Sequence, residues 1–262
     1  MKRRSFVKAS LMTGAAALVT PVMSSAMVIE TPVEFYELRV YTLKNETQQN
    51  LVESFYSKAA IPALNHLGIK HVGVFTELQP AGQTKLFVLI PYAGFSHFNE
   101  VLTKLDLDKG YQKNGASYLN APATYPAYER IESSIMKAFA HSPQMIIPPS
   151  NTRIFELRQY QSASEAAGKK KIEMFNDQGE IDIFKRLGFK PVFWGETVIG
   201  PLRPNLTYMV TFDDLAAKDT HWKSFGADPQ WKKISTVTGY ADALLVNKIT
   251  STLLLPAAYS QI

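Results

Sequence analysis

From residue 33 onward, hydrophobic and polar positions follow first the period of a strand and then the period of a helix. Residues 35–41 alternate, with Tyr36, Leu38 and Val40 on one face, which is the pattern of a strand. Apolar positions 51, 52, 55 and 59 then form the stripe of a helix that begins after the capping residue Asn45. Pro62 is placed to kink this helix, and Leu67-Gly68 is expected to end it.

The same kind of pattern continues to residue 136. It predicts a second strand over 72–78, a hairpin turn at 80–83, a third strand over 86–92 and a second helix over 95–105. A short helix is expected within 108–118 and a fourth strand over 128–136. The order βαββαβ is that of a ferredoxin-like unit.

This unit occurs twice in the chain. Residues 35–41 reappear as residues 154–160 at a spacing of 119, and residues 67–72 match 187–192 at a spacing of 120. Near the ends of the two units, 131–136 match 249–254 at a spacing of 118. The sequence therefore predicts a first repeat over 33–139, a Pro-rich linker over 140–152 and a second repeat over 153–256.

Each unit needs a partner for one face of its sheet. In a ferredoxin-like unit the helices cover one sheet face and leave the other face bare, and a bare sheet of this size would aggregate. Two copies in one chain can bury these faces against each other. We therefore predict an α+β fold of two tandem units packed sheet to sheet, as an intramolecular dimeric α+β barrel.

The charge of the chain is concentrated at its start. The chain carries 28 Lys plus Arg against 23 Asp plus Glu, a formal net charge of +5. Lys2, Arg3, Arg4 and Lys8 supply +4 of this, so the remainder holds 24 basic and 23 acidic residues. An apolar run over 11–22 and small residues at 24–26 follow, which predicts a signal peptide over 1–26.

The basic cluster also indicates a route of export. Residues 3–8, Arg-Arg-Ser-Phe-Val-Lys, resemble the twin-arginine motif, which implies a periplasmic or otherwise exported protein. A retained N-terminal anchor is the alternative; after cleavage no membrane association is expected. This pathway carries proteins with and without cofactors, so the sequence identifies no cofactor and none is expected.

Three motifs of the chain are Tyr-Glu-Leu-Arg-Val-Tyr at 36–41, Leu-Gly-Ile-Lys-His-Val-Gly at 67–73 and Ala-Asp-Pro-Gln-Trp at 227–231. Together they resemble motifs of the NIPSNAP family. The resemblance covers both repeats and departs from the pattern at 107–111 and at Gln159. It implies a fold similar to dimeric α+β barrel proteins, and it implies no defined activity.

Charged and hydroxyl side chains share one face of the first strand in each repeat. Because strand side chains alternate, three residues of each strand point the same way: Glu37, Arg39 and Tyr41, and Glu156, Arg158 and Tyr160. The structural interpretation is a set of ion pairs that fixes register between sheets or lines a rim. The functional interpretation is that the arginine binds a carboxylate or phosphate, with Glu or Tyr transferring a proton.

Histidine offers weaker candidates. His66 and His71 are five residues apart, which is not the spacing of a helical metal pair, and no metal site is expected. His71 occupies the place of Pro191 in the second repeat. The structural interpretation of each histidine is a capping or surface role. Among them, His71 is the best candidate for an axial ligand or a general base.

Aromatic residues are dense at strand and helix ends, and most of them are expected in the core. Tyr92, Trp194 and Trp222 are candidates for lining an apolar cavity between sheet and helices. Glu196 is expected on the same face as Trp194, where an aromatic pocket would raise the pKa of a carboxyl group and suit it to acid–base chemistry.

Three functional hypotheses remain open. The first is an exported protein that binds a small apolar or amphipathic ligand in the cavity of the α+β barrel. The second is a cofactor-independent enzyme of monooxygenase or isomerase type, and the third is a structural or interaction module with a filled core. The balanced charge of residues 27–262 gives no support for nucleic-acid binding, and a homo-oligomer stays open. With no cysteine, disulfides, thiolate metal sites and cysteine nucleophiles are excluded.

Overall fold

The computed structural model describes residues 32–149 and 153–262. The predicted signal peptide and its twin-arginine motif lie outside these residues, as do the last residues of the predicted linker. No helix within the described part is long and apolar enough to span a membrane.

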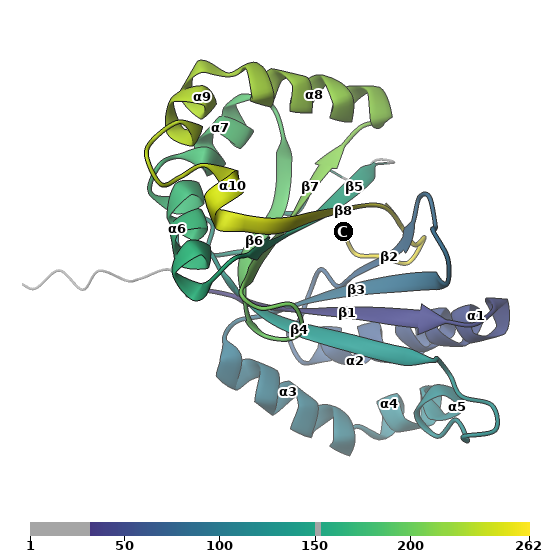
Figure 1. Ribbon diagram of the computed structural model, residues 1–262. Coiled ribbons are helices and arrows are strands. Elements are labelled where there is room, and N and C mark those ends of the chain that lie inside the picture. Colours follow the sequence, from purple (N-terminus) through teal and green to yellow (C-terminus); the bar gives the residue numbers. More distant parts are fainter. Residues whose placement is uncertain (1–31, 150–152) are drawn as a thin grey trace, which may run out of the picture. The chain divides into compact units, whose positions relative to one another are not determined.

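Eight strands close into one barrel (Figure 1), in the order β1-β3-β2-β8-β5-β7-β6-β4. Every pairing in the barrel is antiparallel. The strands of the first repeat are β1 (Phe35–Leu43), β2 (Gly73–Glu77), β3 (Thr84–Tyr92) and β4 (Arg130–Ala138). Those of the second repeat are β5 (Ile154–Ser162), β6 (Lys190–Ile199), β7 (Asn205–Phe212) and β8 (Val246–Pro256).

The two repeats meet edge to edge at two equivalent seams. In each repeat the first strand pairs with the third and fourth, and the second strand pairs with the third. One seam joins β2 to β8 with Phe75 opposite Pro256, and the other joins β4 to β6 with Met136 opposite Thr197. The predicted intramolecular barrel of two ferredoxin-like units is therefore confirmed.

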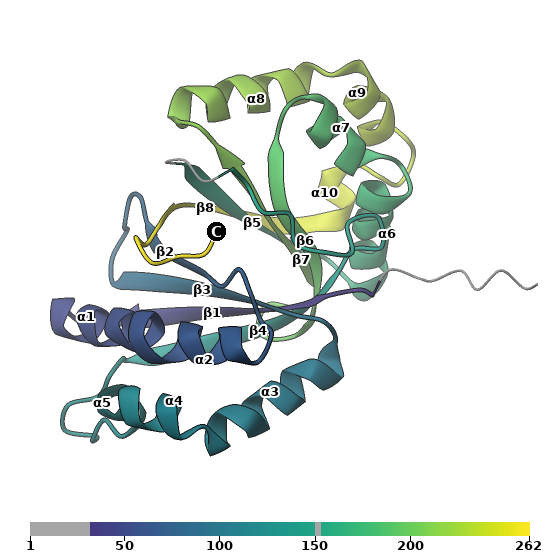
Figure 2. The same ribbon diagram turned by 180° about the vertical axis from the view of Figure 1, so that it is seen from behind.

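Helices cover the outer face of each half of the barrel (Figures 1 and 2). In the first repeat these are α1 (Glu46–Phe55), η1 (Tyr56–Ala60), α2 (Ile61–His66), α3 (Phe95–Leu107), α4 (Lys109–Asn114) and α5 (Ala116–Leu119). In the second they are α6 (Glu165–Asn176), α7 (Glu180–Arg186), α8 (Leu215–Ala227), α9 (Pro229–Ser235) and α10 (Asp242–Leu245).

The first helical segment differs between the repeats. In the first repeat α1, η1 and α2 are continuous, and η1 is a single π-helical stretch that ends beside Pro62. Pro62 lacks an N–H to donate to the preceding turn, which explains the wider turn at this place instead of a simple kink. In the second repeat α6 and α7 are separated at Gly179, whose φ of 84° a glycine adopts readily.

Apolar side chains form three cores. One lies between the sheet and helices of each repeat, and the third is built from residues on the inner faces of both sheets. The inner core contains Tyr36, Leu38, Phe75, Phe87, Leu89, Met136, Ala138, Phe155, Leu157, Val192, Phe193, Met209 and Leu254. The sheet faces that would be bare in a single unit therefore bury each other.

The C-terminal segment covers the edge of β2. The N–H groups of Ala257 and Gln261 donate to the carbonyls of Val74 and Val72. A Cβ on Gly73 would lie 2.6 Å from Ile262 Cδ1, so this close approach requires a glycine. The segment thus extends the seam between the two repeats beyond the paired residues of β8.

Candidate functional site

The Glu-x-Arg-x-Tyr residues of β1 point toward the helices and away from the barrel interior. Tyr36 and Leu38 belong to the inner core, whereas Tyr41 belongs to the core under the helices of the first repeat. Because side chains alternate along a strand, Glu37 and Arg39 share the face of Tyr41. The prediction that these charges could fix register between the two sheets is therefore wrong, since they lie on the opposite face.

Glu37 is fully occupied by donors. Arg39 approaches it through two nitrogens, with Nε 2.7 Å from Oε1 and Nη2 2.9 Å from Oε2. The hydroxyls of Tyr92 and Ser133 donate to Glu37 at 3.1 and 3.2 Å. Its side chain is 5% exposed, while that of Arg39 retains 22%. The carboxylate is thus a buried anchor, and the side chain of Arg39 is the more exposed member of the pair.

A chain of tyrosine hydroxyls leads away from Arg39. Its Nη1 lies 3.4 Å from the hydroxyl of Tyr56, which is 2.8 Å from that of Tyr41. The hydroxyl of Tyr41 is in turn 2.9 Å from that of Tyr118. Burial raises the pKa of all three tyrosines, so their hydroxyls are neutral and can both donate and accept.

Two surface clefts adjoin this cluster. Tyr92 lines a cleft of about 210 Å³ together with His71 and His97. Tyr118 lines a second cleft of about 440 Å³, bounded by the segment over 121–130. Tyr92 and Tyr118 both belong to the hydrogen-bonded cluster, so a residue at each end of the cluster lines a cleft.

His71 lines the smaller cleft. Its φ of 62° is in the left-handed region, which few residues other than glycine occupy. His97 lies in the same cleft, and its Nδ1 accepts a hydrogen bond from Ala93 N–H at 3.2 Å. Across 32–149 and 153–262, no group of three or more His, Asp or Glu side chains could hold a metal ion.

The second repeat repeats the ion pair with different partners. Arg158 Nη1 donates to Glu156 Oε1 at 2.8 Å, and the same carboxylate accepts from Ser251 Oγ and Trp222 Nε1, each at 2.6 Å. The indole of Trp222 also covers the guanidinium, with a centroid distance of 4.4 Å. Arg158 Nη2 donates to Tyr160, whose hydroxyl is 3.2 Å from that of Tyr208.

A buried ion cluster stands beside this pair. Lys171 Nζ lies 3.4 Å from Glu180 Oε2 and 3.0 Å from Asp242 Oδ1, and the rings of Tyr160, Phe175 and Trp231 surround it. Burial acts to lower the pKa of Lys171, but the two carboxylates raise it above its ordinary value. Burial raises the pKa of Glu180 to about 7. One ammonium thus pairs with two carboxylates, of which that of Asp242 is the more exposed.

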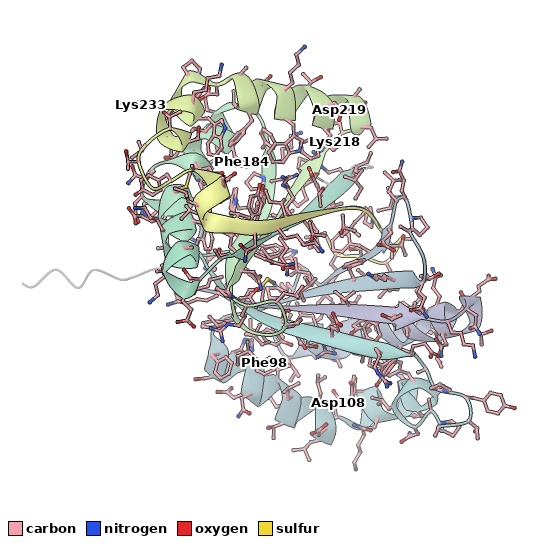
Figure 3. All side chains as sticks on the ribbon, in the orientation of Figure 1. Phe98, Asp108, Phe184, Lys218, Asp219 and Lys233 are labelled. Carbon is pink, nitrogen blue, oxygen red and sulfur yellow. The ribbon has the colours of Figure 1, made fainter. Side chains whose placement is uncertain are left out.

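The remaining aromatic candidates belong to a packed core. Trp194 is fully buried, and its ring lies near Phe184 and Tyr208. Figure 3 shows Phe184 on the side of α7 that faces the sheet. Glu196 instead lines a polar cleft of about 240 Å³ with Lys169 and Arg203. Glu196 therefore lies in a polar cleft and not in the aromatic pocket that was expected around it.

A larger cleft lies where β5 begins and β8 ends. It measures about 750 Å³ and is lined mainly by apolar side chains, among them Phe155, Leu255 and Ile262. Its charged residue, Arg153, is bound to Thr211 and Asp213, so its Nε and Nη1 are not available to a ligand.

Sequence reasoning missed the helix-borne members of both clusters. The π-helical turn that directs Tyr56 has no sequence pattern, and the signal that Tyr56 left is that the second repeat has Phe175 in its place. Lys171 left the same kind of signal, since it interrupts the apolar stripe of α6 at the place where the first repeat has Val52. Its partner Glu180 follows nine residues later, in a separate helix.

The fold defines a class of protein, the α+β barrels in which two ferredoxin-like sheets close on each other and helices cover the outer faces. The family model of NIPSNAP matches residues 36–143 and 155–261, one match in each repeat. The chain belongs to the NIPSNAP family. A comparison with curated proteins gave no match.

Solved structures share the whole barrel. A protein named as a putative monooxygenase from Fusobacterium nucleatum superposes with a TM-score of 0.59 at 11% identity, covering 86% of this chain and 92% of its own. A protein of the same description from Lactobacillus acidophilus gives 0.58 at 9% identity, covering 86% and 94%. An anthrone oxidase-like protein gives 0.53 at 12% identity, covering 86% and 91%. At these identities the likeness shows the fold alone.

Proposed function

We propose that the chain binds a small amphipathic organic ligand on the helix side of the first repeat, with an oxygen of the ligand at Arg39. The observation that carries the proposal is the spare donor capacity of Arg39, whose side chain is 22% exposed beside a carboxylate that is almost fully buried. Nη1 has one long contact, 3.4 Å from Tyr56, so it has capacity for a further acceptor. A charged donor held in place by a buried partner is a typical feature of a small-molecule site.

The second repeat is the weaker candidate for the same role. The indole of Trp222 covers the guanidinium of Arg158, and Tyr160 accepts a hydrogen bond from its Nη2. The inner core of the barrel is built from apolar side chains of both sheets, so it offers a ligand oxygen no charged donor, whereas the helix side of the first repeat offers Arg39.

An enzyme of cofactor-independent monooxygenase type is the second candidate function. Two of the structures with the same barrel carry the monooxygenase name, and the hydroxyl-bearing groups around Arg39 could exchange a proton with a bound phenol or enol. We also propose export to the periplasm through the twin-arginine pathway, on the basis of residues 3–8. The third hypothesis, a purely structural module, predicts that no ligand binds.

The ligand proposal is tested with two probes, 2-naphthol and 2-naphthoate, in calorimetric titrations of the full chain. We expect wild-type protein to bind at least one probe. The substitution Arg39→Gln should weaken binding by roughly 10- to 100-fold, the usual loss for a charged hydrogen bond. Arg158→Gln is the matched control in the second repeat and should change the dissociation constant less than about twofold.

Folding has to be separated from binding in this experiment. Arg39→Gln leaves the carboxylate of Glu37 without its charged partner, so the double variant Glu37→Gln/Arg39→Gln, which buries no unpaired charge, is measured beside it. A folded double variant that still binds the probe like wild type contradicts the proposal. So does the absence of binding of both probes to wild-type protein.

A further inference from the structure

The hydroxyl chain that starts at Arg39 ends at a partly exposed residue, Tyr118. Tyr56 and Tyr41 are fully buried, whereas Tyr118 is partly exposed and lines the cleft of about 440 Å³. The oxygen-to-oxygen distances of 2.8 and 2.9 Å are those of good O–H···O hydrogen bonds. The three side chains come from η1, β1 and α5, so elements far apart in the sequence build one continuous row of hydroxyls.

We propose that Tyr56, Tyr41 and Tyr118 form a proton relay that connects a ligand oxygen at Arg39 with solvent in the cleft beside Tyr118. The inference rests on the proposed ligand site and adds a class of ligand, one with an ionisable O–H group such as a phenol or an enol. Carboxylic acids, already ionised at neutral pH, would bind without using the relay.

The transfer is balanced at each step. The O–H bond of the ligand breaks and its proton bonds to the oxygen of Tyr56, while the proton of Tyr56 passes to Tyr41 and that of Tyr41 to Tyr118. Tyr118 releases its own proton to a water molecule in the cleft. The three tyrosines begin and end neutral, and the ligand is left as an oxyanion beside the positive charge of Arg39.

The second repeat has the start of this arrangement without its continuation. Phe175 takes the place of Tyr56: it meets Tyr160 with an interplanar angle of 81° at 6.4 Å, as Tyr56 meets Tyr41 with 83° at 5.9 Å. The rings are thus packed alike in both repeats, so packing alone does not need the hydroxyl of Tyr56. Its presence in the first repeat extends the hydrogen-bonded row to Arg39.

The test uses 2-naphthol, which becomes a strong acid when excited by light and emits at a longer wavelength once it has lost its proton. Bound to wild-type protein, it should show emission from the naphtholate form. Tyr41→Phe removes the middle hydroxyl and should lower the ratio of naphtholate to naphthol emission roughly tenfold or more, while the dissociation constant changes little. Tyr118→Phe should lower the ratio as well.

Two control variants each remove a tyrosine hydroxyl that is not part of the row formed by Tyr56, Tyr41 and Tyr118. Tyr128→Phe changes a ring 5.6 Å from Tyr41, and Tyr160→Phe changes the equivalent of Tyr41 in the second repeat. Both should retain the wild-type emission ratio. Bound 2-naphthol with an unchanged ratio in Tyr41→Phe overturns the relay and leaves the ligand site standing. If 2-naphthol does not bind but 2-naphthoate does, the ligand site is supported and the relay is rejected. If neither probe binds, both the ligand site and the relay are rejected.

Discussion

The two repeats place the same charged pair on the same strand and surround it differently. Glu37 and Glu156 both hold an arginine two residues further along and both accept from a serine of the neighbouring strand. The helices then supply neutral tyrosines in the first repeat. In the second they supply an indole and the buried charge of Lys171.

The difference separates what the two repeats share, the Glu–Arg pair on the strand, from what differs between them, the helix residues around that pair. A pair that satisfies itself within each strand can survive in both repeats whatever the helices do, because its charges are neutralised locally. The helix-borne residues are free to differ, and they decide what surrounds the arginine: tyrosine hydroxyls in the first repeat and the indole of Trp222 in the second. The exposed fractions of the two arginine side chains are similar, 22% for Arg39 and 17% for Arg158. We therefore expect changes in the helices to affect the two repeats unequally.

The largest effect should come from Lys171 of the second repeat. Lys171→Met leaves the buried carboxyl of Glu180 without its ammonium partner, and breaking a buried pair in this way lowers the free energy of unfolding by about 3–5 kcal/mol. Urea denaturation at pH 8 measures it. The double variant Lys171→Met/Glu180→Gln removes both charges and should recover most of the loss. A double variant as unstable as the single one would show that packing, and not charge, is responsible.

The pH dependence of stability should be the next largest effect. Burial raises the pKa of Glu180 from 4.5 to about 7, so the folded state binds more protons than the unfolded state between these values. Stability is then greatest below pH 4.5 as far as this group is concerned, and falls by up to about 3 kcal/mol as the pH rises through 7.

Urea denaturation of wild type and Glu180→Gln over pH 5 to 8 isolates this contribution. The variant cannot ionise at this position, so the difference between the two proteins should vary with pH as described. Equal pH profiles would mean that Lys171 keeps Glu180 ionised throughout. In the first repeat the position of Lys171 is held by Val52, so this pH effect belongs to the second repeat.

The sequence was sufficient for the barrel and for the pairing of Glu with Arg. The internal repeat, the strand alternation of 35–41 and the need to cover two bare sheet faces led to the architecture that the structure shows. The sequence did not decide which face of the strand points into the barrel. Both faces carry apolar residues, Tyr36, Leu38 and Val40 on one and Phe35 and Tyr41 on the other.

The side chains that contact Arg39 and Lys171 from the helices could not be predicted from the sequence, for a physical reason. Tyr56 reaches Arg39 from the start of a π-helical turn, and Asp242 reaches Lys171 from a four-residue helix 71 positions later in the chain. Such contacts depend on how helices pack over the sheet, and periodicity describes single elements only. Comparing the repeats with each other was the signal available, and it marked Lys171 against Val52.

The smallest expected difference concerns the helix caps of the two repeats. Asp228 accepts hydrogen bonds from the N–H groups of Gln230 and Trp231, each at 3.0 Å, and pairs with Arg186 at 2.9 Å. Its counterpart Asp108, labelled in Figure 3, accepts one N–H bond, from Tyr111 at 2.9 Å. Loss of a cap costs about 0.5–2 kcal/mol, so we expect Asp228→Ala near the upper end and Asp108→Ala near the lower end.

A further substitution at Asp228, to asparagine, can show which of its contacts contributes to stability. Asparagine is as good a cap as aspartate but carries no charge for Arg186, so Asp228→Asn should retain most of the stability measured by thermal unfolding at pH 7. Backbone N–H donation, above all from Trp231, lowers the pKa of Asp228, so its charge and the stability it contributes are lost only as the pH falls below 4. Equal losses for Asp108→Ala and Asp228→Ala would contradict this comparison, because the second repeat would then gain nothing from its additional N–H bond and ion pair.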